Sequence, residues 1–130
     1  PRDHRDLHYP FRRQRQIGIR DMGHTLLVPK VHIPDIFAYD TELAAAVFER
    51  LPKIARAIKA SDPAIKGMNI LNNNGKVAYQ SVFHSHIHLI PRYSDQDDFG
   101  MHFGDHSAQY DTEKLEAVAD KIRTQLEAQA

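Results

Sequence analysis

The sequence predicts an α+β domain with a small antiparallel sheet, and two observations support this. Short apolar or β-branched runs that end at turns are interspersed with two segments in which apolar residues recur every three or four positions. The first pattern is typical of strands and the second of amphipathic helices. Strands that come before, between and after helices favour the α+β class. A length of 130 residues fits one domain with a single core.

Three strands are expected along the chain. The first covers residues 24–29, an apolar run that is closed by Pro29. The second covers residues 67–72 and leads into a polar turn. The third and longest candidate extends from Gln80 to Tyr93, with a strand near residues 86–91.

Two helices are expected, near residues 41–60 and 112–127. Asp40 is a suitable N-cap for the first helix, because its carboxylate can accept from a free backbone amide. Residues spaced by three or four positions form the apolar face of the first helix: Leu43, Val47, Leu51, Ile54 and Ile58. The corresponding stripe of the second helix is Leu115, Val118, Ile122 and Leu126.

Residues 1–22 form a divergent N-terminal segment before the main domain, residues 23–130. Residues 1–20 contain six arginines but only two acids, and they show no clean alternation before Ile17-Gly18-Ile19. Because such a segment lacks a face that it could bury, we expect an extended arm or a degraded hairpin with weak packing.

Composition excludes several classes of function. Seventeen basic residues balance seventeen acidic ones, which disfavours a nucleic-acid binder. No apolar run approaches the roughly 18 residues of a membrane span, and the arginine-rich start lacks the apolar stretch of a signal peptide. Without cysteine there is no disulfide, thiol nucleophile or cysteine-based zinc site. We therefore expect a soluble, cytoplasmic protein that binds neither nucleic acid nor membrane.

The most informative feature is a cluster of three histidines, His84, His86 and His88, within five positions. In a strand their side chains would share one face, each about 6.6 Å from the last. Phe83 and Ile87, with Leu89, would then project to the opposite face and supply core. Three histidines in strict alternation favour a functional role over a merely polar face.

Two chemistries fit this row. Histidines on one strand can bind zinc, with a third ligand from His32 or His24. Alternatively, one imidazole attacks phosphorus and its neighbours orient it and carry protons. Gln80 and Ser81 offer neutral donors nearby, and the Asn72-Asn73-Asn74-Gly75 turn offers exposed backbone amides. Those groups suit a ribose, a phosphate and a leaving group.

Three motifs in the same order resemble the histidine triad (HIT) superfamily, on the branch of Hint-like bacterial nucleotide hydrolases. The first is a Gly-His segment that ends in Pro-Lys-x-His, the second an Asn-Gly turn followed by Gln-Ser, and the third His-x-His-x-His. In this chain they read Gly23-His24-Thr25-Leu26-Leu27-Val28-Pro29-Lys30-Val31-His32, Asn72-Asn73-Asn74-Gly75 with Gln80-Ser81-Val82, and His84-Ser85-His86-Ile87-His88-Leu89-Ile90.

The resemblance implies a role for each matching residue. His86 would be the nucleophile, His88 would contact the phosphate, and His84 would orient the array. Ser81 and Gln80 would lie near the bridging or leaving atom.

Further positions would complete the site by the same resemblance. Asn73 and Gly75 would bind the phosphate and ribose, and His24 would support the triad from behind. Ile17 and Ile19 are the candidates for the apolar wall of the base pocket.

The resemblance also implies a fold and an activity. The fold is an antiparallel sheet of about five strands with a long central helix, commonly paired as a homodimer. The activity is cleavage at the α-phosphate of a purine nucleoside phosphoramidate or related conjugate, through a covalent nucleotidyl-histidine that releases the nucleoside monophosphate. Two alternatives remain: a metal-dependent hydrolase that uses the histidine cluster, and a nucleotide-binding regulator with vestigial hydrolysis.

The N-terminal segment departs from the family pattern. Family members carry a CxxC pair there, whose cysteines bind zinc together with histidines that match His32 and His84. This chain has no cysteine, and two imidazoles are too few for a closed tetrahedral site. We therefore expect that no metal cofactor is required. Gln16 also stands where the family has the aspartate that holds the ribose hydroxyls.

Overall fold

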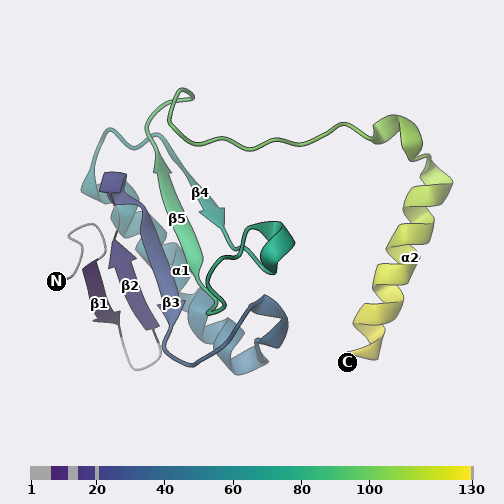
Figure 1. Ribbon diagram of the computed structural model, residues 1–130, viewed down its shortest axis with the longest axis horizontal. Helices are drawn as coiled ribbons and strands as arrows, with labels where there is room; N and C mark the ends of the chain where they lie inside the picture. The colour runs from purple at the N-terminus through teal and green to yellow at the C-terminus, as the bar shows by residue number, and fades with distance from the viewer. Residues whose placement is uncertain (1–6, 12–14, 20, 130) are drawn as a thin grey trace. The chain divides into compact units, whose positions relative to one another are not determined.

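The computed structural model describes residues 7–11, 15–19 and 21–129, with side chains from Met22 onward. The chain forms two compact units, Pro1–Asp97 and Asp98–Ala130. The strands, all in the first unit, are β1 (Leu7–Phe11), β2 (Arg15–Ile19), β3 (Thr25–Pro29), β4 (Gly67–Leu71) and β5 (Ile87–Arg92). The helices are α1 (Thr41–Ser61) in the first unit and α2 (Thr112–Ala128) in the second (Figure 1).

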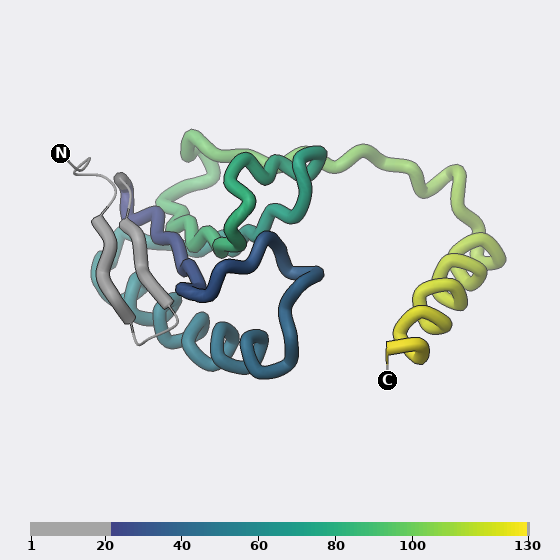
Figure 2. The backbone as a smooth tube through the Cα atoms, turned by 60° about the horizontal axis from the view of Figure 1, so that its bottom comes forward, coloured from purple at the N-terminus to yellow at the C-terminus, as the bar shows by residue number. Residues whose placement is uncertain are grey.

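The described strands form one antiparallel sheet in the order β1-β2-β3-β5-β4. Helix α1 lies across one face of this sheet (Figures 1 and 2). The predicted α+β class is confirmed. Helices α1 and α2 begin where the sequence predicts them and end one residue later.

Helix α1 begins at Thr41 because Asp40 caps it. One carboxylate oxygen of Asp40 accepts from the backbone amide of Leu43 at 2.8 Å, which satisfies an amide that has no partner inside the helix. The predicted apolar face then turns toward the sheet. Buried residues of α1 and of the sheet form one core cluster with the neighbouring Ile33: Leu27, Leu43, Val47, Leu51, Ile54, Ile87 and Leu89.

Strand β5, Ile87–Arg92, confirms the strand predicted near residues 86–91, whereas the longer candidate from Gln80 to Tyr93 is wrong over residues 80–86. The β3–β5 ladder ends at the pair Leu27↔Ile87, and the β4–β5 ladder ends at Leu71↔His88. Residues 82–84 bend instead of continuing the strand. The prediction that Phe83 belongs to the core is wrong for this reason, since its side chain is 54% exposed.

Of the two expectations for the N-terminal segment, an extended arm or a degraded hairpin, the pairing of strands β1 and β2 favours the hairpin. Strand β2 pairs with β3 from Arg15↔Pro29 to Ile19↔Thr25, and β1 pairs with β2 in turn. The lack of an apolar face on this segment does not prevent the pairing, because a ladder is built from backbone groups, which the edge of β3 supplies. The packing of these side chains lies outside the described residues, and the domain boundary at residue 23 stays a prediction.

Helix α2 carries its predicted apolar stripe on an exposed face. Asp111 caps the helix by accepting from the backbone amide of Lys114 at 2.9 Å. The four stripe residues are between 44% and 62% exposed: Leu115, Val118, Ile122 and Leu126. Within the described part of the chain, neither α1 nor α2 has the length and apolar character needed to cross a membrane.

Removal of the α1 cap should destabilise the fold. We expect Asp40→Ala to lower the free energy of unfolding by about 1 kcal/mol, because the Leu43 amide loses its acceptor. Asp40→Asn is the matched control, since asparagine caps about as well and should cost only a few tenths of a kcal/mol. Urea unfolding of the three proteins measures the difference. An equal loss in both variants would contradict the capping role.

Candidate active site

The site residues gather at one end of the sheet. Because β3 and β4 both run antiparallel to β5, their C-terminal parts lie beside the start of β5, with Leu27 opposite Ile87 and Leu71 opposite His88. Residues 72–86, which connect β4 to β5, fold into a loop at this end (Figures 1 and 2). The segment that follows β3 is tied to this loop, since Ser85 donates its backbone amide to the Ile33 carbonyl oxygen at 2.7 Å.

His88 lies in β5 on the face turned away from α1. Its neighbours Ile87 and Leu89 are buried in the core, whereas His88 is half-buried, as alternation along a strand requires. The Nδ1 atom of His88 is 2.9 Å from Nε2 of His24. The structure therefore brings His24 behind His88, where it fixes the orientation of the His88 ring.

His86 is held in one tautomer by a backbone carbonyl. Its Nδ1 is 2.8 Å from the carbonyl oxygen of His84. A carbonyl oxygen only accepts, so Nδ1 carries the proton, and in the neutral ring Nε2 is left with a lone pair. The rings of His86 and His88 meet edge to face, with centroids 4.9 Å apart. His86 thus presents a nucleophilic nitrogen beside a second imidazole.

His84 does not extend this row. Its Nε2 donates to the carbonyl oxygen of Pro29 at 2.7 Å, and its ring meets that of His32 edge to face at 5.7 Å. The expected single row of three imidazoles is therefore wrong: His86 and His88 meet each other, and His84 meets His32. The cause is the late start of β5, because strict alternation holds only within a strand.

The described residues do not fit a zinc ion. His32 and His84 supply only two of the four ligands of a structural site, and Nε2 of His84 is already engaged by Pro29. In the part of the chain that the structure describes, no three histidine, aspartate or glutamate side chains are grouped to hold a metal.

Gln80 is buried, with 3% exposed, and its amide holds the loop together. Its Nε2 donates to the carbonyl oxygens of Pro34 at 2.6 Å and Val82 at 3.1 Å, and its Oε1 accepts from the Gly75 amide at 2.8 Å. The structure thus places Gln80 inside the loop rather than open to a leaving group. Gln80 also accepts from the Gly75 amide, although Gly75 was expected to bind the phosphate and ribose.

Two asparagines of the turn support the triad in a way that the sequence did not reveal. Asn72 donates its side-chain amide to the carbonyl oxygen of His86 at 2.9 Å. Asn74 in turn donates to Oδ1 of Asn72 at 2.7 Å and accepts from the Ile36 amide at 2.8 Å. The Asn-Asn-Asn-Gly run signalled only a turn. The position of His86 in space was needed to show which backbone group Asn72 reaches.

The remaining predicted residues border the site. Asn73 is half-buried and Ser81 is exposed, so solvent reaches both. Ile17 and Ile19 lie on β2, opposite Leu27 and Thr25 of β3. Their side chains lie outside the described residues, as does that of Gln16, so the base pocket stays a prediction.

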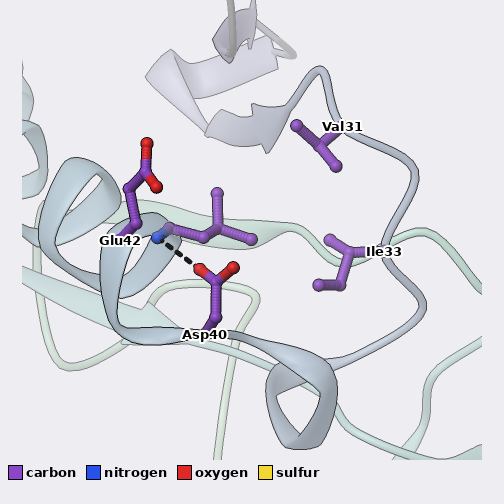
Figure 3. Close-up of a pocket in the computed structure, with 5 residues that line it drawn as sticks. Val31, Ile33, Asp40 and Glu42 are labelled. Carbon is purple, nitrogen blue, oxygen red and sulfur yellow. Dashed lines mark hydrogen bonds between the residues drawn. The ribbon is translucent and has the colours of Figure 1, made fainter.

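A separate cavity of about 200 Å³ lies where α1 begins. Val31, Ile33 and Leu43 supply its apolar wall, with the carboxylates of Asp40 and Glu42 beside them (Figure 3). Asp40 is already used as the α1 cap, and none of the triad histidines lines this cavity. It is therefore distinct from the histidine site.

Comparisons with known proteins agree with this fold and site. The HIT domain family model matches residues 15–95. A relative from Bacillus subtilis, Protein hit, is 46% identical over 104 residues, which cover 80% of this chain and 71% of that protein. The Schizosaccharomyces pombe adenosine 5'-monophosphoramidase hnt1 is 31% identical, over 80% of this chain and 73% of that protein.

A crystal structure of a HIT family protein from Bacillus anthracis superposes with a TM-score of 0.85 at 41% identity, covering 92% of this chain and 87% of that one. The antiparallel sheet with neighbouring histidines at one end is the fold of these HIT proteins, and the matches extend over most of the chain. The chain belongs to the HIT domain family.

Replacement of Gln80 should loosen the loop. We expect Gln80→Leu to lower the free energy of unfolding by about 1–3 kcal/mol, because it leaves the Gly75 amide and two carbonyl oxygens without their partner. Gln109→Leu makes the same change at an exposed position and should be close to neutral. Thermal unfolding of both variants checks this. If Gln80→Leu were as stable as Gln109→Leu, the bracing role would be wrong.

Proposed function

We propose that this protein hydrolyses nucleoside phosphoramidates or related nucleotidyl conjugates at the α-phosphate, with His86 as a covalent nucleophile. The observation that carries the proposal is the bond between Nδ1 of His86 and the His84 carbonyl oxygen. This bond leaves the lone pair on Nε2 without the need for a separate base, which is the condition for imidazole to attack phosphorus.

The reaction proceeds in two displacements. Nε2 of His86 attacks the α-phosphorus, a phosphorus–nitrogen bond forms, and the bond to the leaving amine breaks with its electron pair. The amine takes up a proton from solvent and departs. Water then attacks the phosphorus and loses a proton, and the electron pair of the bond to Nε2 returns to His86, which frees the nucleoside monophosphate.

The neighbours of His86 stabilise these steps. The imidazolium character that His86 acquires in the adduct strengthens its Nδ1–H bond to the carbonyl of His84. His88, held by His24, contacts the phosphate oxygens and stabilises their charge in the transition state. His84 acts through its carbonyl rather than through its ring. Ser81 and Asn73 are accessible to the phosphate and ribose.

The substrate class rests on chemistry that several compounds share. Adenosine and guanosine phosphoramidates, aminoacyl adenylates and dinucleoside polyphosphates all present an α-phosphate with a leaving group. The name of the Schizosaccharomyces pombe relative, an adenosine 5'-monophosphoramidase, supports the phosphoramidate among them. A purine base, a homodimeric assembly and a cytoplasmic location stay predictions.

The His86→Ala variant tests the proposal. We expect turnover of adenosine phosphoramidate to be nearly abolished, because no other group supplies the attacking lone pair. Affinity for AMP should stay within roughly tenfold, because His88, Ser81 and backbone donors still bind the phosphate. Steady-state kinetics and calorimetric AMP titration measure the two effects.

His102→Ala removes an exposed histidine of the second unit and is the matched control, with kinetics like those of the unmodified protein. Full activity of His86→Ala would refute the nucleophile. An unmodified protein that binds AMP without turnover would instead support the regulator.

Chelation separates this mechanism from a metal-dependent one. We expect activity to be unchanged in EDTA, because no three histidine, aspartate or glutamate side chains of the described residues are grouped to hold a metal ion. The measurement is the rate after dialysis against EDTA, compared with the rate after zinc is added back. Loss of activity that zinc restores would favour the metal-dependent hydrolase.

A further inference from the structure

Ser85, between His84 and His86, is buried, with 1% exposed, and is held at two points. Its backbone amide donates to the Ile33 carbonyl oxygen at 2.7 Å. Its Oγ is 2.8 Å from the hydroxyl oxygen of Tyr39. Both partners belong to the segment between β3 and α1. The buried side of the histidine segment is therefore anchored to the segment between β3 and α1, to which Gln80 also bonds through the Pro34 carbonyl oxygen.

The first of these anchors acts on the peptide that fixes His86. The Ser85 amide and the His84 carbonyl belong to one planar peptide unit. The amide of this unit donates to Ile33, and its carbonyl accepts from Nδ1 of His86. A rotation of the plane would weaken both bonds and would turn the His86 ring. The direction of the attacking Nε2 thus depends on the orientation of one peptide.

The neighbouring ladders do not hold this peptide. Pairing of β5 with β3 and β4 stops at Ile87 and His88. Two side chains constrain it instead, one from each of its Cα atoms: His84 bonds the Pro29 carbonyl oxygen, and Ser85 bonds the Tyr39 hydroxyl. Tyr39 in turn is placed firmly, since it directly precedes Asp40, the α1 cap, and packs against the core cluster.

We propose that Tyr39 and Ser85 are positioning residues for catalysis, whose hydroxyl–hydroxyl bond fixes the His84–Ser85 peptide and thereby aims Nε2 of His86 at phosphorus. This inference rests on the proposed function and deepens it, because it adds two residues that touch neither substrate nor reacting atoms. Burial raises the pKa of Tyr39 above its ordinary value, so its hydroxyl is neutral at neutral pH and either hydroxyl can donate in this bond.

Loss of the bond between Tyr39 and Ser85 should lower turnover rather than substrate binding. Misplacement of a reacting group by about 1 Å can cost on the order of a hundredfold in rate, and loss of one tether should cost part of that. We expect kcat to fall about tenfold in Tyr39→Phe and in Ser85→Ala, with KM within about twofold. Tyr110→Phe removes the hydroxyl of a tyrosine in the second unit and should leave both constants unchanged.

The double variant Tyr39→Phe/Ser85→Ala distinguishes positioning from a structural role. Each single variant leaves one buried hydroxyl without its partner and lowers the unfolding midpoint, whereas the double variant leaves neither and recovers part of that loss. Its kcat should stay as low as in the single variants, because the tether is still absent. The proposal would be overturned if kcat of the double variant recovered together with its stability. It would also be overturned if kcat of both single variants lay within about twofold of that of the unmodified protein.

A readout without turnover separates this inference from the proposed function. Nitrogen-15 NMR of the imidazoles should show the His86 ring signals shifted or broadened in both single variants, with those of the exposed His106 unchanged. If the unmodified protein turned over none of the substrates, the proposed function would fail, and these signals would decide the positioning role alone. Unchanged His86 signals in both variants would refute it.

Discussion

The peptide between His84 and Ser85 makes two hydrogen bonds, and the rest of the candidate site depends on them. Its carbonyl accepts from Nδ1 of His86 at 2.8 Å, and its amide donates to Ile33 at 2.7 Å. Because the peptide is planar, neither bond can move without the other. The first bond leaves the lone pair on Nε2 of His86. The second bond holds the same peptide to the segment before α1. In the proposed mechanism, this peptide directs the attacking nitrogen of His86.

This peptide lies just outside the sheet, so side chains replace the ladder that would otherwise hold it. Amide side chains of Asn72 and Gln80 satisfy backbone groups of the loop, and Tyr39 bonds the hydroxyl of Ser85. These supports come from elements that the α1–sheet core holds in place. The arrangement matches a general feature of binding sites, in which a rigid scaffold positions reactive groups on loops. It also explains why buried polar residues are concentrated near the histidines.

Much of the fold could be predicted because helix caps and the spacing of apolar residues act on the element in which they occur. Asp40 caps the helix that follows it, and the spacing of apolar residues selects the face of α1 that is buried. The strand near residues 86–91 could be predicted, but the bend at residues 82–84 could not, and the expected places of Phe83 and His84 failed with it. The motifs located the site, but the bonds of Gln80 and Ser85 join segments about fifty residues apart and become visible only in three dimensions.

Direct detection of the covalent intermediate tests the central claim most directly. The protein would be mixed with adenosine phosphoramidate, quenched rapidly without acid and digested, and its peptides would be sequenced by mass spectrometry. The account predicts one adenylyl group on the histidine segment, with fragment ions that place it on His86 rather than on His84 or His88. An adduct on another residue, or turnover during which His86 is never modified, would contradict the account.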